Sequence, residues 1–577
     1  MTITNAEIAE TFELMADLLE LQGANPFRVR SYRNSARVIR DLPEPVADIV
    51  AQDPKRLLEI DGIGESVAAK CQTLVQTGKL PQLEELRAQV PEGLLALLRI
   101  PGLGPKKAAA LHKELGIQSV ADLEKACREG RVRQLKGFGE KTEKAILENL
   151  SLAQQAEQRI FWADADQIVQ QLLKHLKQAP GVEQAEVAGS YRRGRETVGD
   201  LDVLVVSTQP SKVMDQFAKF ADVGEVLARG DTKMSIRTKR GLQIDLRVVP
   251  AESFGAALQY FTGSKAHNIE LRSRARQRGL KINEYGVYRG EERIAGRTEE
   301  EVYAALGLPW IPPELREARQ EFQWADQGKL PELVRLEEIR GDLHMHTSDS
   351  DGSASLEEMA EAAVRRRLRY IAITDHSPRV SMAHGLDPRR LRKQWRLIDE
   401  LNDRYEGKLK ILKGVECDIL EKGGMDLPDD VLAEADWVVA SIHYGQRQSR
   451  QQITERMLQA IEHPSVRVIA HPTGRLINRR EPYQVDLETV FREAAQHGKF
   501  LEINATPDRL DLNDVHAAAA RQHGVLLVIS TDAHSPEGLD AMRYGVLQAR
   551  RAGLSAQDVL NTRPWHEFSR LVWGKSG

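Results

Sequence analysis

In the last third of the chain, apolar and polar stretches alternate in a way that predicts strands separated by helices. Helix-like stretches, such as 355–367 and 488–497, stand between short apolar runs. These strand-like runs cover residues 370–374, 412–415, 437–442, 466–470 and 525–531. An ionisable residue stands at or just beyond the end of each run. Repeated strand and helix units with ionisable groups at the strand ends predict an α/β barrel with an active site at that rim.

Two further strands are predicted in the middle of the chain. Residues 189–204 join a loop of small residues to a strand with Asp200 and Asp202, and residues 243–249 form a strand-like run whose one acid, Asp245, has apolar neighbours. Residues two apart on a strand share a face. An isolated Asp-x-Asp more often only starts or caps a strand, but the preceding small-residue loop favours a site. Three such acids can bind two divalent metals beside a nucleoside triphosphate, which predicts nucleotidyl transfer.

Three segments of the first third share another pattern, in which an apolar residue precedes Gly-x-Gly and a helix-like stretch. Hairpins of helix-hairpin-helix elements have this pattern, and their bare backbone N–H groups suit a DNA phosphate. One Gly-x-Gly is most often a plain turn between helices. Three of them between residues 60 and 140 favour DNA binding. The glycines concerned are Gly62, Gly64, Gly102, Gly104, Gly137 and Gly139.

Bulk composition limits the classes of protein. A length of 577 residues predicts several domains. The net charge of −4 gives no overall attraction to nucleic acid, so any DNA contact must be local. The three cysteines form neither a disulfide framework nor a cysteine-type zinc site, which fits a reducing cytoplasm. Without an export-signal pattern or a run of membrane-spanning length, we expect a soluble, unexported protein with no membrane partner.

Histidines are concentrated behind residue 340, where twelve of the fifteen lie. A single histidine at a strand end is usually a core residue, but six at equivalent places together with three acids predict a metal cluster. Imidazoles with a few carboxylates suit two or three zinc, manganese or iron ions, which would bind phosphate and supply hydroxide. The predicted ligands are His344, His346, Asp351, His376, Glu416, His443, His471, Asp532 and His534.

The helix-hairpin-helix repeats, the Gly-Ser to Asp-x-Asp block and Asp245 together resemble the family X DNA polymerases, of which DNA polymerase beta is the best known. The resemblance covers residues 1 to about 315 and includes the segment 260–268. It implies that Asp200, Asp202 and Asp245 are catalytic and hold Mg²⁺ or Mn²⁺. It implies dNTP contacts, with Ser190 and Arg193 on the triphosphate and Tyr260 and Phe261 by the sugar, and a template contact at Arg272. The full implied dNTP set is Gly189, Ser190, Arg193, Gly199, Tyr260, Phe261, Gly263, Lys265 and Asn268.

The chain departs from polymerase beta at several positions. Lys265 stands where that enzyme has an acid, and Gln243 stands where the family often has an arginine. Lys70 aligns with the lyase lysine of the family, which makes it a candidate Schiff-base nucleophile. Ser66 and Gln82 replace supporting lysines, which counts against lyase activity.

The C-terminal motifs resemble the polymerase and histidinol phosphatase (PHP) domain over residues 341 to about 570. These motifs are His344-x-His346, Ser350-Asp351-Gly352, Thr374-Asp375-His376, Gly414-Val415-Glu416, Ser441-Ile442-His443, Ala470-His471-Pro472 and Asp532-Ala533-His534. Every ligand position is kept, so the resemblance implies an active metal-dependent phosphoesterase. Its fold would be a distorted, TIM-like α/β barrel.

The predicted organisation is multidomain, with α-helical helix-hairpin-helix N-terminal domains, an α+β nucleotidyltransferase palm and the PHP barrel. The expected bounds are 1–85 for an 8-kDa-like DNA-end-binding domain, 86–155 for a second DNA-binding domain, 156–250 for the palm, 251–315 for a nascent-base-pair domain, 316–340 for a linker and 341–577 for the barrel.

The leading hypothesis is a bacterial, monomeric gap-filling repair polymerase that acts on gapped or nicked duplex DNA with dNTPs, and whose barrel is a 3′–5′ exonuclease. A 3′ phosphatase or abasic-site endonuclease activity is also open for the barrel. One rival is a template-independent nucleotidyltransferase fused to a small-molecule phosphoesterase. Another is a DNA-end scaffold in which both sites are silent.

Overall fold

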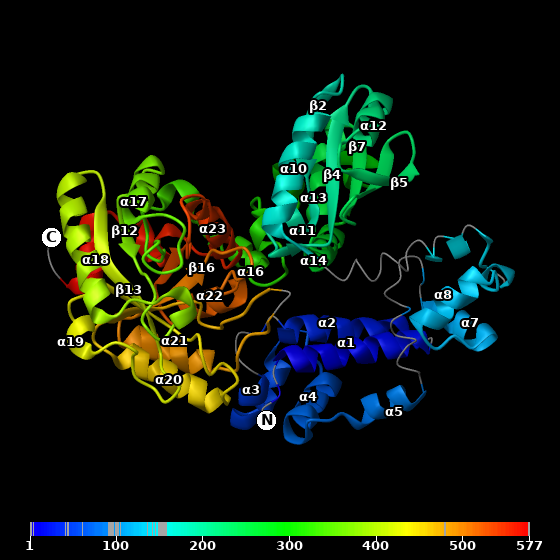
Figure 1. Cartoon of the computed structure of the whole chain (residues 1–577). Helices are drawn as coiled ribbons and strands as arrows, with labels where there is room; N and C mark the ends of the chain where they lie inside the picture. The colour runs from blue at the N-terminus through cyan, green and yellow to red at the C-terminus, as the bar shows by residue number, and fades with distance from the viewer. Residues whose placement is uncertain are drawn as a thin grey trace. The chain divides into compact units, whose positions relative to one another are not determined.

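The computed structural model divides the chain into two compact units, Met1–Gln158 and Arg159–Gly577 (Figure 1). It describes residues 3, 5–22, 24–40, 42, 46–60, 62–89, 97, 103, 105–135, 137–140, 142–144, 146–147, 159–477 and 480–574. Among these residues, no helix is both long enough and apolar enough to cross a membrane. The predicted fold class, with helical N-terminal domains, an α+β palm and a C-terminal α/β barrel, is confirmed.

Helices make up the described part of the first unit. Its buried apolar side chains form one cluster, in which Ile8, Phe12 and Met15 of the first helix take part. The elements are α1 (Asn5–Leu21), α2 (Pro26–Arg40), α3 (Val46–Gln52), η1 (Pro54–Glu59), α4 (Glu65–Thr77), α5 (Pro81–Gln89), α7 (Pro105–Leu115), α8 (Val120–Arg128) and η2 (Val132–Gln134).

A five-stranded mixed sheet forms the predicted palm, with the strand order β2-β4-β7-β6-β5. The central strands β4 and β7 run parallel, whereas the other neighbours are antiparallel. The palm elements are β1 (Ile160–Phe161), α10 (Trp162–Leu176), β2 (Val182–Val187), α11 (Gly189–Arg192), β3 (Thr197–Val198), β4 (Asp200–Ser207), α12 (Pro210–Ala218), β5 (Val223–Arg229), β6 (Lys233–Thr238) and β7 (Gln243–Val249).

A smaller sheet of order β10-β9-β8 follows, with helices around it. Phe322 and Leu333, from the stretch predicted as a linker, are buried in the same apolar cluster as Leu271 and Val302. The elements are η3 (Ala251–Ser253), α13 (Phe254–Thr262), α14 (Lys265–Gln277), β8 (Lys281–Asn283), β9 (Gly286–Arg289), β10 (Glu292–Ala295), α15 (Glu299–Ala305), η4 (Pro313–Leu315), α16 (Glu321–Asp326) and η5 (Leu336–Glu338).

Seven parallel strands in sequential order, β11 to β17, form the barrel. A parallel bridge between Met345 and Ala533 connects the region of the first strand to that of the last. The strands are β11 (Gly341–Asp342), β12 (Tyr370–Ile373), β13 (Lys410–Asp418), β14 (Trp437–Ser441), β15 (Val466–Ile469), β16 (Phe500–Asn504) and β17 (Leu527–Ser530). The helices are α17 (Leu356–Arg365), η6 (Ser381–Ala383), α18 (Pro388–Arg404), α19 (Asp429–Leu432), α20 (Arg450–Glu462), α21 (Leu487–Gln496), α22 (Asp514–Gln522), η7 (Glu537–Ala541), α23 (Met542–Arg551), η8 (Ala556–Asp558), η9 (Leu560–Thr562) and α24 (Trp565–Trp573).

Two apolar clusters hold the barrel together. The larger one packs the helices onto the outside of the strands. In the smaller one, Phe568 of α24 packs against Tyr370 and Trp437, which belong to the barrel strands, at ring-centroid distances of 4.5 and 6.0 Å. Tyr370 and Trp437 are the first residues of their strands, so α24 covers the N-terminal end of the barrel. The C-terminal rim is left for polar side chains.

Candidate active sites

Three acids of the palm meet on one face of its sheet. In the parallel pair of β4 and β7, Asp202 lies directly opposite Asp245, and Asp200 lies two residues before Asp202 on the same face. Burial, together with the charges of Asp200 and Asp245, raises the pKa of Asp202 to about 6. A divalent cation would relieve this repulsion, so the acids fit the predicted metal site.

Removing the charge of Asp202 is expected to stabilise the metal-free protein. A carboxyl whose pKa is raised in the folded state favours folding below its unfolded pKa, near 4, and this contribution is lost as the pH rises through about 6. Asp202→Asn should therefore raise the free energy of unfolding by roughly 1–2 kcal/mol at pH 8 in a chelator, and by about half as much at pH 5. Thermal melts at both pH values measure this. The control is the exposed Asp231→Asn, and equal effects at both pH values would contradict the expectation.

Neutral groups hold the third acid in place. Ser235 Oγ donates a hydrogen bond to Asp245 Oδ1, and Gln243 Nε2 donates one to Oδ2 at 3.2 Å. Where the family often has an arginine, the amide of Gln243 thus orients Asp245 without neutralising its charge. Sequence reasoning did not identify Ser235, because a serine on a strand carries no signal until the pairing of β6 with β7 is known.

The loop before β4 brings its backbone close to one of these acids and contains a buried hydroxyl. Gly189 has a φ of +65°, which favours glycine, and a Cβ there would lie 3.2 Å from Asp202 Oδ2 and crowd that carboxylate. The next residue, Ser190, has a buried Oγ with no hydrogen-bond partner among the described residues. A buried hydroxyl without a partner is costly, and a triphosphate oxygen would satisfy it.

The structure places Arg193 in an ion pair. Its Nε lies 3.1 Å from Glu317 Oε1, and its Nη1 donates to the backbone oxygen of Thr262 at 2.5 Å. Burial lowers the pKa of the guanidinium, and Glu317 counteracts this effect. Arg193, the implied triphosphate ligand, therefore lies in the loop before β4, but its guanidinium pairs with Glu317.

The segment implied to contact the nucleotide lies at the junction of α13 and α14. Asn268 Nδ2 donates to the backbone oxygen of Tyr260 at 2.7 Å, and the guanidinium of Arg272 stacks over the Tyr260 ring at 5.3 Å. Phe261 is covered in the same way by the guanidinium of Arg247, at 4.6 Å. The remaining implied dNTP residues are Gly199, where a Cβ would lie 2.9 Å from Arg159 Nη1, Gly263, with a φ of +69°, and Lys265, which is exposed.

Two of the three predicted hairpins have the same backbone turn. Gly62 and Gly137 have φ values of +92° and +89°, and in each turn the next N–H bonds back to a carbonyl three residues earlier, Ile63 to Ile60 and Phe138 to Leu135. Gly64 and Gly139 each accept the first bonds of a following helix. The middle pair, Gly102 and Gly104, lies outside the described residues.

Lys70 lies on α4, after the first hairpin. Its Nζ donates to Ser66 Oγ at 2.8 Å and to the Ser66 backbone oxygen at 3.1 Å. The Nζ also lies 5.6 Å from the centroid of the Tyr32 ring. Ser66, which replaces a supporting lysine of the family, therefore accepts a hydrogen bond directly from Lys70, the candidate nucleophile.

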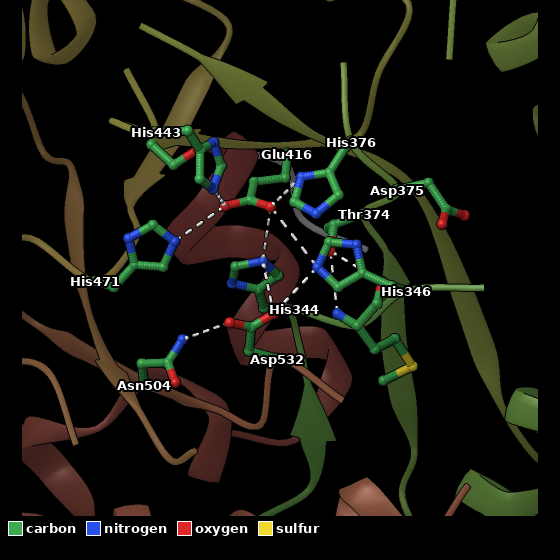
Figure 2. Close-up of polar contacts among 12 residues, drawn as sticks. His344, His346, Thr374, Asp375, His376, Glu416, His443, His471, Asn504 and Asp532 are labelled. Carbon is green, nitrogen blue, oxygen red and sulfur yellow. Dashed lines mark hydrogen bonds and ion pairs between the residues drawn. The ribbon is translucent and has the colours of Figure 1, made fainter. Parts of the chain in front are cut away.

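The nine predicted ligands of the barrel meet at its C-terminal rim. Figure 2 labels all of them except Asp351 and His534. Three groups have ligand atoms that lie within 4.8 Å of one another. They are His346, Asp351, His376 and His534; His344, His346 and Glu416; and His376, Glu416 and His443. The other two residues join the same cluster, because His471 Nε2 lies 3.1 Å from Glu416 Oε1 and His346 Nε2 lies 3.1 Å from Asp532 Oδ1.

Glu416 is the hub of the cluster. Its carboxylate lies 2.8–3.7 Å from a ring nitrogen of each of five histidines, namely His344, His346, His376, His443 and His471. Figure 2 shows these rings around Glu416; His344 and His346 follow the same strand, β11, and the other three follow β12, β14 and β15. One fully buried carboxylate amid five imidazoles is suited to bridging cations.

Several of these buried atoms lack a hydrogen-bond partner within the described parts of the chain. They are Nε2 of His344, Nδ1 of His346 and Nδ1 of His471. Leaving so many polar atoms unsatisfied is unfavourable in a protein interior. The donor set and its unsatisfied atoms therefore fit a multinuclear metal site.

The ionisation of the cluster follows from burial and close charges. Burial disfavours charged imidazole, but Glu416 outweighs it and raises the pKa of His376 to about 10 and that of His443 to about 9. His346 is the exception, because burial and the neighbouring His376 lower its pKa to about 4. The histidines hold the pKa of Glu416 well below its usual range, despite its burial.

Two buried acids next to the ligands were missed by the sequence reasoning. Glu502 Oε1 lies 2.7 Å from His344 Nδ1, and its Oε2 accepts from the backbone N–H of His471 at 2.8 Å. Asp418 Oδ1 lies 3.2 Å from His443 Nδ1. Such carboxylates fix the tautomer and orientation of a ligating imidazole. For Glu502 the available signal was a single acid inside an apolar strand, as at Asp245, and for Asp418 it was the position two residues after Glu416 on β13.

Models of known families match successive parts of the chain. A helix-hairpin-helix domain matches residues 3–80 and a SAM-like helix-hairpin-helix tandem matches 94–151. The DNA polymerase beta palm matches residues 159–239, the DNA polymerase beta thumb 257–317 and the PHP domain 342–506.

Curated relatives agree with this division. The chain is 42% identical to the "DNA polymerase/3′-5′ exonuclease PolX" of Bacillus subtilis (strain 168) over 567 residues, which is 96% of this chain and 97% of the relative. It is 30% identical to a probable phosphatase of Thermoanaerobacter sp. (strain X514) over 38% of this chain and 89% of that protein. A probable phosphatase of Caldanaerobacter subterraneus subsp. tengcongensis is 32% identical over 33% of the chain and 75% of that protein. The chain therefore belongs to the PolX family, the polymerase-beta-like DNA polymerases that carry a C-terminal PHP domain.

Proposed function

We propose that this chain is a template-directed, gap-filling DNA polymerase of DNA repair, and that its PHP barrel removes nucleotides from 3′ ends in the 3′–5′ direction. The observation that carries the polymerase assignment is the pairing of Asp202 with Asp245 across β4 and β7, with the unpartnered hydroxyl of Ser190 in the preceding loop. The similarity to a DNA polymerase/3′-5′ exonuclease along almost the whole chain supports both activities.

In the polymerase site, Asp200, Asp202 and Asp245 would hold Mg²⁺ or Mn²⁺, which when bound activates a 3′ hydroxyl and neutralises the leaving pyrophosphate. Ser190 donates its hydroxyl to the triphosphate, and Gly189 lets the backbone approach it. Tyr260 and Phe261 are proposed to contact the sugar. Gly199, Gly263, Lys265 and Asn268 would complete the dNTP site, and Arg272 would contact the template.

In the barrel, the nine clustered residues would hold two or three zinc, manganese or iron ions, which when bound polarise the scissile phosphodiester and supply hydroxide. Glu502 and Asp418 keep His344 and His443 in the orientation that presents Nε2 to the centre. The 3′–5′ exonuclease is the proposed main reaction, and 3′ phosphatase and abasic-site endonuclease reactions use the same chemistry.

The proposed DNA substrate is a gapped or nicked duplex, bound in part by backbone amides of the hairpins at Gly62, Gly64, Gly102, Gly104, Gly137 and Gly139. Lys70 is the proposed nucleophile of a lyase activity, against which the replacement of the supporting lysines counts. We further propose a monomer that works in the bacterial cytoplasm and associates with the nucleoid during repair, with the domain limits given above.

The rival functions are less well supported. A template-independent nucleotidyltransferase with a small-molecule phosphoesterase does not require helix-hairpin-helix elements, whereas two such families match the first 151 residues. A silent scaffold does not require nine intact ligand positions around one buried carboxylate.

A gapped-duplex assay tests the proposal. With Mg²⁺ or Mn²⁺ and all four dNTPs, we expect incorporation of the templated nucleotide into a short gap, at least about tenfold faster than on a single-stranded primer. Without dNTPs, we expect stepwise shortening from the 3′ end. Equal incorporation of all four nucleotides with and without a template would favour the template-independent rival. No incorporation and no shortening in any metal would favour the scaffold.

A further inference from the structure

One face of α23, a helix of the barrel, contacts the palm within the second unit. The contacting residues are Arg543, Tyr544, Leu547, Gln548 and Arg551. Their spacing of one, four, five and eight positions from the first is that of a single helical face. The other side of α23 belongs to the barrel core, through Met542, Val546 and Ala549. The helix therefore connects two domains with different proposed activities.

The contacts of this face concentrate on the loop of residues 189–196, which we call the nucleotide loop. Arg551 Nη1 donates to the backbone oxygen of Arg193 at 2.7 Å, and Gln548 Nε2 donates to Glu196 Oε1 at 2.8 Å. Leu547 lies against Gly194, where a Cβ would come within 2.6 Å of the leucine side chain. Arg475, from the loop after β15, also forms two hydrogen bonds with the carboxylate of Glu196.

A second set of contacts reaches the same loop through α10. The ring of Tyr544 packs edge-on against that of Trp162, with a centroid distance of 5.8 Å. Trp162 in turn stacks on the ring of Tyr191 in the loop, with a centroid distance of 5.0 Å, and its Nε1 donates to the backbone oxygen of Tyr191 at 2.8 Å. Arg543 Nη1 lies 3.0 Å from Asp166 Oδ2, and Asp166 Oδ1 accepts a 2.6 Å bond from the Tyr191 hydroxyl. Both paths therefore end on the nucleotide loop.

A buried charge network joins the loop to the barrel. Glu317 Oε1 lies 3.1 Å from both Arg193 Nε and Arg551 Nη1, and Asp514 Oδ2 lies 2.7 Å from Arg551 Nη2 and 3.0 Å from Arg319 Nη1. Arg551 and Asp514 belong to the barrel, whereas Arg193 belongs to the palm. Buried guanidinium and carboxylate groups hold a defined geometry only when each has its partners.

The loop has little regular structure of its own to hold it. Its helix α11 spans only Gly189–Arg192, and the glycines on either side of the turn, Gly189 and Gly194, have φ values of +65° and +66°. Glycine at such positions allows the turn but does not fix it. Its position therefore depends on what packs against it. These contacts come from the sheet, from Thr262 and Glu299, which bond to Arg192, and from α23.

We propose that the barrel positions the dNTP-binding loop of the polymerase, with Arg551 as the central positioning residue. This inference rests on the proposed polymerase function. Arg551 does not touch the three catalytic acids. It holds the backbone oxygen of Arg193, and it also holds Glu317, the carboxylate that pairs with the Arg193 guanidinium. Its loss would therefore weaken dNTP binding more than the chemical step.

The test is Arg551→Met in the full-length chain, assayed on a gapped duplex. We expect the KM for dNTP to rise about tenfold while kcat stays within about threefold, because the loop is displaced and the acids are not. Arg551→Lys, which keeps the charge but not the forked geometry, should give an intermediate KM. Release of nucleotides from a 3′ end, measured on the same preparations, reports whether the barrel is folded. The matched control is Arg392→Met, which removes a surface arginine that pairs with Glu434 within the barrel.

The outcomes separate the inference from the function on which it rests. An unchanged KM for dNTP in Arg551→Met with normal 3′ release would overturn the inference and leave the polymerase assignment intact. A wild-type chain that incorporates no dNTP would overturn the function itself. If Arg551→Met loses both activities, Gln548→Leu decides, since it removes a bond to Glu196 without exposing a buried charge. A KM raised about threefold supports the inference, and an unchanged KM refutes it.

Discussion

Asp202→Asn is expected to reduce dNMP incorporation at least about 1,000-fold, while release of nucleotides from a 3′ end stays within about twofold of wild type. Asp202 has both other acids as neighbours. It pairs with Asp245 across β4 and β7, and Asp200 precedes it by two residues on the same face of β4. The amide preserves the shape of the side chain but removes the charge that a divalent cation requires. Primer extension on a gapped duplex with Mg²⁺ measures the first activity, and 3′ shortening without dNTPs measures the second.

The control for this variant is Asp231→Asn, an exposed acid between β5 and β6 of the same sheet, which should extend primers like wild type. Incorporation by Asp202→Asn within tenfold of wild type would contradict the assignment of the palm acids. Loss of both activities together would indicate one shared site or a folding defect, and the thermal melt distinguishes these.

Glu416→Gln is expected to reduce 3′ nucleotide release at least about 1,000-fold and to lower the metal content of the purified protein. The carboxylate lies within 3.7 Å of a ring nitrogen in five histidines and is fully buried, so its charge holds the cluster together electrostatically. The amide is nearly isosteric and offers one neutral oxygen. Elemental analysis gives the ions per chain, and an end-labelled duplex gives the rate of 3′ shortening.

Glu421→Gln is the matched control, because Glu421 comes five residues later and pairs on the surface with Arg379. It should keep its metal content and both activities. Primer extension by Glu416→Gln should match wild type in Mg²⁺. Full metal content with unchanged 3′ release would show that the cluster is not the hydrolytic centre.

The sequence was sufficient to find side chains whose position follows from strand geometry alone. In a parallel barrel all strands end at the same rim, so the residue type at each strand end predicted the nine clustered groups without knowledge of helix packing. The same holds for Asp200 and Asp202, which share a face by the period of two. Only the pairing of β4 with β7 was needed to add Asp245.

Other features depend on contacts that no local pattern encodes. Arg193 was implied as a triphosphate ligand, but its pairing with Glu317 joins residues 124 positions apart. Glu502 is a single acid in an apolar strand, but that pattern does not reveal its partner, His344, which lies 158 positions away. The amphipathic pattern of α23 indicates a helix with one buried face. It does not reveal that the opposite face contacts the palm, because polar residues such as Gln548 and Arg551 are equally common on a solvent-exposed face.

The bridge between Met345 and Ala533 has a consequence for how the protein is made. A ribosome releases residues from the N-terminus onward, so both strands with the palm acids emerge by residue 249, and that sheet can form early. The hydrolytic cluster needs His344 and His346 from one end of the barrel and Asp532 and His534 from the other. It is complete only when nearly the whole polypeptide has been translated, so every product terminated before Asp532 lacks two residues of the hydrolytic cluster.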